Sequence, residues 1–490
     1  MSDKKSIVLL EANQLSRLIR NKEISCREVM EIYLDHIESF NPRVNAIISM
    51  RDKNSLLKEA DEKDIALEKG EYQGWLHGIP FAVKDLALTQ GITTTRGSPI
   101  FADNVPDKDA LIVERIKKAG AIIIGKTNTP EFGLGSQTYN SVFGATGNAY
   151  NHQLTAGGSS GGAAAALAMY LLPVADGSDM MGSLRNPAAF NNVIGFRPSQ
   201  GRVPLTESNE LFINQMAYEG PMGRCVKDVA LLLATQAGRD DRAPLSLNET
   251  GDQFTESLVM DCTDVRVGWL GDLQGHLPFE EGILSLCEKA RNTFSAIGCE
   301  VNTVAIDIDF ETVWNAWRTL RHISVAHSLE PLYSDPGKRK WLKPEALWEI
   351  ENGLGLSAMQ LMQASAVRTL LYKKIIALFD EVDYLILPSA QVFPFDKNSH
   401  WPETISGREM DTYHRWMEVT ILGSLTGCPI ANVPAGFNES GLPTGIQIIG
   451  RPQRDMAVLR LAHAYEKATH WIAKNKPDAI KESELIRYLL

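Results

Sequence analysis

The chain has 490 residues and a mass of 54.1 kDa, enough for about three domains of ~150 residues or for one large domain. Hydrophobic residues make up 44% and charged residues 22% of it, which is typical of a globular protein and excludes a disordered, collagenous or coiled-coil chain. Its 49 Lys and Arg against 60 Asp and Glu give a formal net charge of −11, so we expect neither a nucleic acid nor a membrane as a partner.

Residues 1–70 are expected to form a helical N-terminal arm. Ser25 and Glu28 have the spacing of a capping box, in which each side chain accepts a hydrogen bond from the backbone of the other. Apolar residues then recur at helical spacing until the pair Asn41 and Pro42, where we expect the helix to end.

The sequence predicts a cytoplasmic protein. The apolar run Ile7–Leu10 is too short for the core of a signal peptide. The long apolar stretch Gly161–Ala175 falls below the ~20 residues that span a bilayer, contains Pro173, and predicts a buried helix. Six cysteines without CxxC spacing indicate free thiols of a reducing compartment: Cys26, Cys225, Cys262, Cys287, Cys299 and Cys428.

A lysine ends the apolar run within Gly78–Leu86. Most lysines are solvated, and that is the ordinary interpretation of Lys84 taken alone. A lysine buried at the end of a strand is different, because desolvation lowers its pKa from ~10.4 toward neutrality and lets it act as a base.

The next elements alternate between helix and strand. The amphipathic stretch 109–119 predicts a helix and 121–124 a buried strand. Gly120–Thr127 also fits the pattern of a phosphate-binding loop, but its middle is a β-branched run without glycine, so we interpret it as a strand and expect no nucleotide. Ser55–Lys58 fits another short catalytic pattern and is interpreted as a solvated helix face.

The glycine- and serine-rich loop 156–162 precedes an apolar run directly. Glycines let backbone N–H groups approach a ligand, and the helix that follows adds the positive end of its dipole. Ser159 and Ser160 each stand at the centre of a G-x-S-x-G pattern, which raises the possibility of an α/β-hydrolase nucleophile. That motif needs a preceding strand, and the polar stretch 150–155 is a poor strand.

A second loop of small residues, 176–188, surrounds Ser183 and also holds Asp179 and Arg185. In isolation such a serine is more often a turn or capping residue. His322 and His327 stand five positions apart, off the spacing of a zinc-binding helix, and no other metal cluster is evident, so we expect no metal and no cofactor.

The later chain continues the alternation of strands and helices. No linker, charge block or internal repeat divides it. We therefore predict an α/β fold in one domain, with a large mixed β-sheet covered by helices on both faces. The expected strands are 265–270, 385–387, 430–433 and 445–449, and the expected helices are 227–237, 358–379 and 455–470.

Three of these segments together resemble the amidase signature family: the loop 156–162, the segment 182–188 and the lysine within 78–86. The resemblance extends to 125–132, 195–203, 219–222 and 441–450. It covers nearly the whole chain, most strongly over 74–240 and 425–466. It implies one domain, 1–490, with the helical arm 1–70, a signature core 74–240, a variable substrate-side segment 245–415 and a C-terminal part of the core 425–470.

The resemblance implies an amidase that converts a carboxamide into a carboxylate and ammonia or an amine through an acyl-enzyme. It assigns Ser183 as nucleophile, Ser159 as a bridging serine held by a cis peptide and Lys84 as base, because a serine hydroxyl is a weak nucleophile until a neighbour takes its proton. The oxyanion would be held by the backbone amides of Met180, Met181, Gly182 and Ser183, and the supporting residues would be Ser160, Asp179 and Arg185.

The chain departs from the family pattern at Met181, where family members usually carry glycine. A methionine keeps its N–H, so the donor is retained, but it tolerates a positive φ poorly, which would alter the geometry of this loop. The expected partner is a small-molecule amide, and the resemblance is compatible with a homodimer.

Two alternatives stay open. The glutaminase component of a tRNA-dependent amidotransferase shares the fold and the triad, but its glutamine-binding arginine and aspartate are not matched here, at 352–356 and 416–418. A catalytically inactive binding protein could also keep the fold.

Tryptophans and methionines gather in 310–420. Because ligand pockets are mostly apolar and aromatic, this clustering predicts a wall for an apolar or aryl acyl chain; the competing interpretation is that these side chains pack helices against the sheet. Met180 and Met181, beside the proposed nucleophile, favour a pocket for apolar ligands. The clustered residues are Trp314, Trp317, Trp341, Trp348, Met359, Met362, Trp401, Met410, Trp416 and Met417.

Overall fold

The computed structural model describes residues 4–213 and 215–481. Its strands are β1 (Ile47–Ile48), β2 (Pro80–Lys84), β3 (Ile122–Thr127), β4 (Val174–Asp179), β5 (Ile194–Arg197), β6 (Tyr218–Gly223), β7 (Arg266–Trp269), β8 (Glu300–Thr303), β9 (Tyr384–Pro388), β10 (Thr404–Ile405), β11 (Arg408–Glu409), β12 (Ile430–Phe437) and β13 (Pro443–Gly450).

The largest sheet has eight strands in the order β4-β6-β5-β12-β13-β9-β7-β8. Strand β7 runs parallel to β8 and β9, whereas the other neighbours are antiparallel, so the sheet is mixed. The strands expected at 265–270, 385–387, 430–433 and 445–449 are β7, β9, β12 and β13, which together form half of this sheet.

The helices are α1 (Ala12–Arg20), α2 (Cys26–Val44), α3 (Lys53–Glu68), α4 (Leu111–Lys118), α5 (Gly161–Ala168), α6 (Asn186–Phe190), α7 (Val226–Gln236), α8 (Ile283–Ala296), α9 (Phe310–Tyr333), α10 (Pro336–Arg339), α11 (Pro344–Leu354), α12 (Ala358–Glu381), α13 (Ile421–Thr426), α14 (Asp455–Thr469), α15 (Trp471–Lys474) and α16 (Asp478–Lys481).

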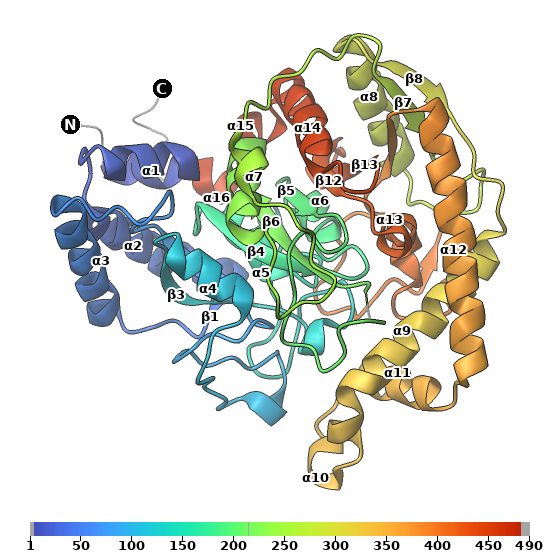
Figure 1. Ribbon diagram of the computed structural model, residues 1–490, viewed down its shortest axis with the longest axis horizontal. Helices are drawn as coiled ribbons and strands as arrows, with labels where there is room; N and C mark the ends of the chain where they lie inside the picture. The colour runs from blue at the N-terminus through green and yellow to red at the C-terminus, as the bar shows by residue number, and fades with distance from the viewer. Residues whose placement is uncertain (1–3, 214, 482–490) are drawn as a thin grey trace.

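Helices flank the large sheet, which confirms the predicted fold class (Figure 1). Helices α6, α8 and α14 pack on its central strands β12 and β13. Helices α11 and α12 pack on α9, and both α9 and α12 also bury side chains in the core of the large sheet. No helix in the described part of the chain is both long and apolar enough to cross a bilayer.

The N-terminal arm is helical, as expected, and leads into a smaller three-stranded sheet, β1-β3-β2. Ser25 caps α2, and the capping box with Glu28 is present. The predicted end of this helix was wrong by one turn, since α2 includes Pro42 and continues to Val44, where Asn45 adopts a left-handed conformation. Residues 1–3 of the predicted arm lie outside the described residues.

The stretch Gly161–Ala175 is buried, but it is not one helix. Helix α5 ends at Ala168, Tyr170 adopts a positive φ of 58°, and β4 begins at Val174. The left-handed conformation of Tyr170 ends the helix, because a residue at positive φ cannot continue a right-handed helix. Pro173 favours extended backbone before it and leads into the strand. The strand that carries the predicted nucleophile loop therefore starts inside the stretch that the apolar pattern assigned to a helix.

Candidate active site

Lys84 is the last residue of β2, and its side chain is buried, with 1% of its surface exposed. Across the strand it pairs in register with Thr127 of β3. Its backbone N–H lies 3.1 and 3.3 Å from the two carboxylate oxygens of Asp176 on β4. This contact ties the end of the small sheet to the edge strand of the large sheet and fixes where the lysine side chain begins.

The ammonium group of Lys84 is surrounded by hydroxyl groups. Its Nζ lies 2.8 Å from Ser159 Oγ, 2.9 Å from Ser160 Oγ and 3.0 Å from Ser178 Oγ. Burial lowers the pKa of Lys84 to about 7, although the negative charges of nearby carboxylates act in the opposite direction. A lysine in these surroundings is therefore neutral for much of its time near neutral pH and can accept a proton.

The glycine- and serine-rich loop brings Ser159 to this lysine through closely packed backbone. The Gly158–Ser159 peptide bond is cis, and Ser160 is the N-cap of α5. A Cβ on Gly161 would lie 2.3 Å from Thr138 Oγ1, and one on Gly162 would lie 2.3 Å from Asn128 N. These glycines are thus required because other chain segments approach them, and the interpretation of the loop as a flexible linker does not hold.

The loop around Ser183 is held by the carboxylate of Asp179. That carboxylate accepts hydrogen bonds from Gly182 N at 2.8 Å and Leu184 N at 3.1 Å. It also accepts two bonds of 2.9 Å from the guanidinium of Arg185. All these groups are buried. Burial alone would raise the pKa of Asp179, but the charge and hydrogen bonds of Arg185, together with Arg197, lower it to about 2.

Met181 fits the loop without strain. The residue with a left-handed conformation is Gly182, with a φ of +86°, and a Cβ there would lie 2.7 Å from Thr420 Cγ2. Met181 is not among the residues with positive φ. The Gly182 amide already donates to Asp179, so the expected oxyanion donors are reduced to the amides of Met180, Met181 and Ser183.

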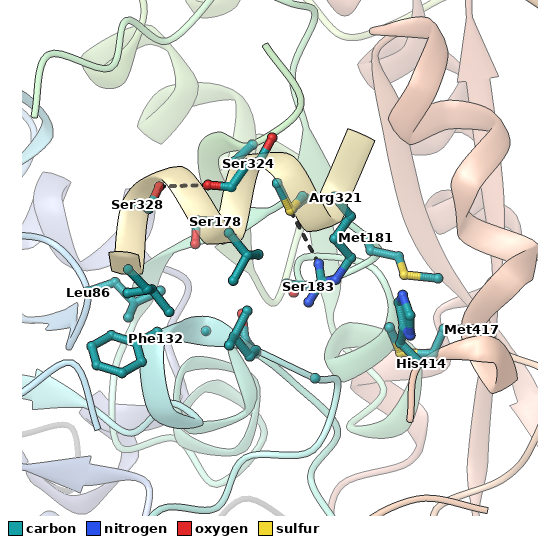
Figure 2. Close-up of a pocket in the computed structure, with 18 residues that line it drawn as sticks. Leu86, Phe132, Ser178, Met181, Ser183, Arg321, Ser324, Ser328, His414 and Met417 are labelled. Atoms are coloured by element: carbon teal, nitrogen blue, oxygen red, sulfur yellow. Dashed lines mark hydrogen bonds between the residues drawn. The ribbon is translucent and has the colours of Figure 1, made fainter. Parts of the chain in front are cut away.

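A pocket of about 220 Å³ opens beside these residues, with Ser159, Ser178 and Ser183 in its wall (Figure 2). Facing the serines, α9 contributes Arg321 and four neighbours at helical spacing. Most of the remaining wall is apolar. Ser183 is 7% exposed, so it is largely covered by its neighbours. The apolar lining residues are Leu86, Phe132, Leu134, Met180, Met181, Ala217, Val325, Leu329 and Met417.

The predicted tryptophan wall was wrong. No tryptophan is among the described residues that line this pocket: Trp314, Trp317 and Trp416 are buried in the main hydrophobic core. Trp341 is 54% exposed. The reason is their position along α9. Trp314 and Trp317 lie on the same face of the helix as Arg321, but on the N-terminal turns, which pack in the core, while the turns from Arg321 to Leu329 line the pocket. Of the clustered methionines, Met417 lines the pocket, as do Met180 and Met181.

Four site residues were not singled out by the sequence. Asp176 and Ser178 stand in the second loop of small residues but have no distinguishing pattern there, although both contact Lys84. Arg321 and His414 line the pocket from the variable segment, 93 positions apart in the chain, and no local motif marks either.

The two patterns rejected as coincidences belong to ordinary structure. Lys126, of the phosphate-loop pattern, lies in β3 and donates to the carbonyl of Ala87 and the hydroxyl of Thr89. Lys58 lies on α3 with its side chain 80% exposed. Within the described residues, no group of three or more His, Cys, Asp or Glu side chains is arranged to hold a metal ion.

Comparison with known proteins gives a consistent picture. A family model described as Amidase matches residues 28–459. An acylamidase from Rhodococcus erythropolis is 32% identical over 476 residues, which cover 96% of this chain and 98% of that protein. A component of the glutamyl-tRNA(Gln) amidotransferase from Thermosynechococcus vestitus is 31% identical over 479 residues, 94% of this chain and 98% of that protein.

Solved structures agree with these relatives. The crystal structure of a bacterial aryl acylamidase superposes with a TM-score of 0.88 at 31% identity and covers 95% of this chain and 98% of its own. The corresponding component of the glutamyl-tRNA(Gln) amidotransferase from Thermotoga maritima superposes with a TM-score of 0.76 at 26% identity, over 95% and 96% of the two chains.

Proposed function

Because the chain belongs to the amidase signature family of amide-bond hydrolases, we propose that it hydrolyses apolar or aryl carboxamides through an acyl-enzyme on Ser183. Lys84 acts as the base and Ser159 as the bridge between base and nucleophile. The observation that carries this proposal is the surroundings of Lys84, a buried lysine that contacts three hydroxyl groups. Two of these hydroxyls, those of Ser159 and Ser178, share a pocket wall with Ser183.

Acylation proceeds by proton relay. Neutral Lys84 takes the proton of Ser159 while Ser159 takes that of Ser183, and Ser183 Oγ attacks the amide carbon. The carbonyl oxygen becomes an oxyanion that receives hydrogen bonds from the backbone amides of Met180, Met181 and Ser183. The relay then returns the proton to the nitrogen, the C–N bond breaks, and the amine or ammonia leaves.

Deacylation reverses the relay with water. Water gives a proton through Ser159 to Lys84 and attacks the ester carbon, and the oxyanion forms at the same place. The proton passes back to Ser183 as the ester bond breaks, which releases the carboxylic acid. Asp179 acts through the loop, because its bonds to Gly182 and Leu184 hold the backbone on either side of the nucleophile.

The apolar lining of the pocket supports the choice of substrate. Methionines next to Ser183 and leucine, valine and phenylalanine side chains opposite it favour a hydrocarbon or aromatic substituent. The names of two similar proteins, an acylamidase and an aryl acylamidase, point the same way. A cytoplasmic location and a homodimer stay predictions.

A second candidate, supported by the amidotransferase relatives, is a glutaminase that works within such a complex. It needs groups that bind the charged ends of glutamine. In the later segment Glu418 is committed to other partners, since its carboxylate lies 2.9 Å from Arg415 Nε and 2.7 Å from His276 Nε2. We therefore rank this candidate below the acylamidase. The intact set of Lys84, Ser159 and Ser183 ranks an inactive binding protein lower still.

The nucleophile can be identified by covalent labelling. A fluorophosphonate should form an adduct on Ser183, located by mass spectrometry of the digested protein, and Ser183→Ala should abolish both the adduct and amide turnover. Ser160→Ala should be milder, since Ser160 lies next to the lysine but not in the pocket wall. An adduct on Ser160 in the wild-type protein would contradict the assignment and favour the α/β-hydrolase nucleophile suggested by the G-x-S-x-G pattern.

A further inference from the structure

We propose that Arg321 and His414 form a subsite that binds a neutral hydrogen-bond acceptor on the acyl chain of the substrate, such as a second carbonyl oxygen. This inference rests on the proposed hydrolysis of amides at Ser183. It adds a preference for a polar group on the substrate to a pocket that is otherwise mostly apolar. Both residues line the pocket that contains Ser183.

Arg321 has one guanidinium nitrogen that faces the pocket. Its Nε lies 2.6 Å from Glu349 Oε1, and its Nη2 donates to Tyr413 Oη at 2.7 Å. Its Nη1 contacts the thioether of Met180, with Sδ at 3.3 Å. A thioether is a weak acceptor, and methionine is flexible, so a substrate oxygen can displace this contact with a gain in hydrogen bonding.

The charge of Arg321 is already compensated, which sets the preference for a neutral group. Glu349 is fully buried; besides Arg321, its carboxylate contacts His322 Nδ1 and Tyr413 Oη, each at 2.6 Å. Burial alone would raise the pKa of Glu349, but the charge of Arg321 and the contact with His322 hold it below its usual range. A substrate carboxylate would bring a second negative charge close to Glu349, and both carboxylates would then have to pair with the single guanidinium of Arg321. Binding of a charged group is therefore disfavoured.

His414 supplies the second polar group. It is 1% exposed, and its ring stacks on Tyr413 with centroids 4.6 Å apart. Within the described residues neither ring nitrogen has a hydrogen-bond partner. Burial and the nearby charge of Arg321 lower the pKa of His414 well below its usual value, so the ring is neutral and offers one donor and one acceptor. Buried polar groups in proteins are nearly always satisfied, and a ligand in the adjoining pocket can do this.

The two residues reach the pocket from segments that are far apart in the chain. Arg321 projects from α9, and His414 lies beside Met417 just before α13 (Figure 2). The ring of Tyr413 connects them, because it stacks on His414 and its hydroxyl accepts the hydrogen bond from Arg321. The subsite is therefore held by buried contacts before any ligand enters.

The test compares three p-nitroanilides whose acyl chains have equal length and nearly equal shape. One chain ends in a methyl ketone, one in an isopropyl group and one in a carboxylate. Their affinities are measured by calorimetry on the Ser183→Ala protein, which separates recognition from chemistry. We expect the ketone to bind about tenfold more tightly than the isopropyl compound, the effect of one hydrogen bond to a charged donor, and the carboxylate to bind more weakly than the ketone.

Two variants locate the effect. His414→Phe and the double change Arg321→Met with Glu349→Gln, which removes both charges together, should each reduce the tenfold preference to about threefold or less. The matched control is Ser328→Ala on the same face of α9, whose hydroxyl already donates to the carbonyl of Ser324; it should keep the preference. Equal binding of ketone and isopropyl compounds, or tightest binding of the carboxylate, overturns the subsite. An adduct on a residue other than Ser183 contradicts only the proposed chemistry, because these affinities do not depend on turnover.

Discussion

Lys84 and Lys126 are both buried lysines, and only their neighbours distinguish their roles. Burial lowers the pKa of Lys84 to about 7 and that of Lys126 to about 8. Lys84 contacts the hydroxyls of Ser159 and Ser178 beside the pocket, whereas Lys126 contacts a carbonyl and the hydroxyl of Thr89 away from it. A lowered pKa alone would therefore not identify the base, and the proposed assignment of Lys84 depends on its contact with Ser159.

The pH dependence of activity should report the protonation of Lys84. The base must be neutral before attack, and its pKa is lowered to about 7, so kcat/KM should fall as pH decreases below this value and reach a plateau above it. Lys84→Ala should remove this limb and at least about 100-fold of the rate. The measurement is a pH profile of anilide hydrolysis. Lys126→Met is the control, and loss of the limb in that variant alone would show that the wrong lysine has been assigned.

The residues of the site differ in how far the sequence reveals them. Ser159 and Ser183 stand in loops of small residues whose order is specific, and Lys84 ends an apolar run, so a pattern in the sequence singles out all three as candidates. Arg321 and His414 have no such signal, because their place in the pocket depends on how α9 packs against a segment far along the chain. No stretch of residues around either one encodes that packing.

At the level of single elements, local patterns predict beginnings better than ends. The capping box at Ser25 marks the start of α2 correctly because it depends only on Ser25 and Glu28, which are close neighbours in the chain. The end of α5 is set by the left-handed turn at Tyr170, which no local pattern marks, so the apolar composition of the stretch predicted too long a helix. Likewise, both fully buried tryptophans of α9 obey the helical period, but they lie on the N-terminal turns, which pack in the core.

The nucleophile loop should be a stabilising element as well as a catalytic one. Asp179→Asn leaves the buried guanidinium of Arg185 without its counter-charge and should reduce the free energy of unfolding by about 3–5 kcal/mol, measured by urea denaturation. The matched control is Asp35→Asn, which breaks an exposed ion pair with Lys53 and should cost less than about 1 kcal/mol.

The same carboxylate predicts the acid sensitivity of the fold. The pKa of Asp179 is lowered to about 2 from 3.8, so its contribution to stability is complete above its unfolded value and is lost as pH falls through the interval between these two values. The acid-induced loss of stability should therefore be smaller in Asp179→Asn than in the wild-type protein over that interval. Parallel losses in the two proteins would contradict this role.

In the whole molecule, the pocket lies between two hydrophobic clusters. Met181 and Met417 in its wall belong to the core of the large sheet. Val325 and Leu329 belong to a second, smaller cluster between α9 and α11. The family pattern encodes the catalytic side of this junction, while the side formed by α9 comes from the variable segment. This is why the sequence predicted the reaction in more detail than the substrate.

The position of the pocket between these clusters leads to the prediction on substrate choice. Its wall is mostly apolar, and Arg321, the charged residue among the described residues that line it, is already paired with Glu349, so the α-carboxylate and ammonium of glutamine would lose their hydration without an opposite charge in return. Each buried methylene of an apolar acyl chain, by contrast, contributes about 1–3 kcal/mol. We expect medium-chain or aromatic amides to be hydrolysed by the isolated chain with a kcat/KM at least about tenfold above those of acetamide, asparagine and glutamine. Release of ammonia or aniline from a panel of such amides measures this directly. Faster turnover of glutamine than of every apolar amide would favour the amidotransferase glutaminase instead, because a glutaminase must recognise both charged groups that this pocket leaves uncompensated.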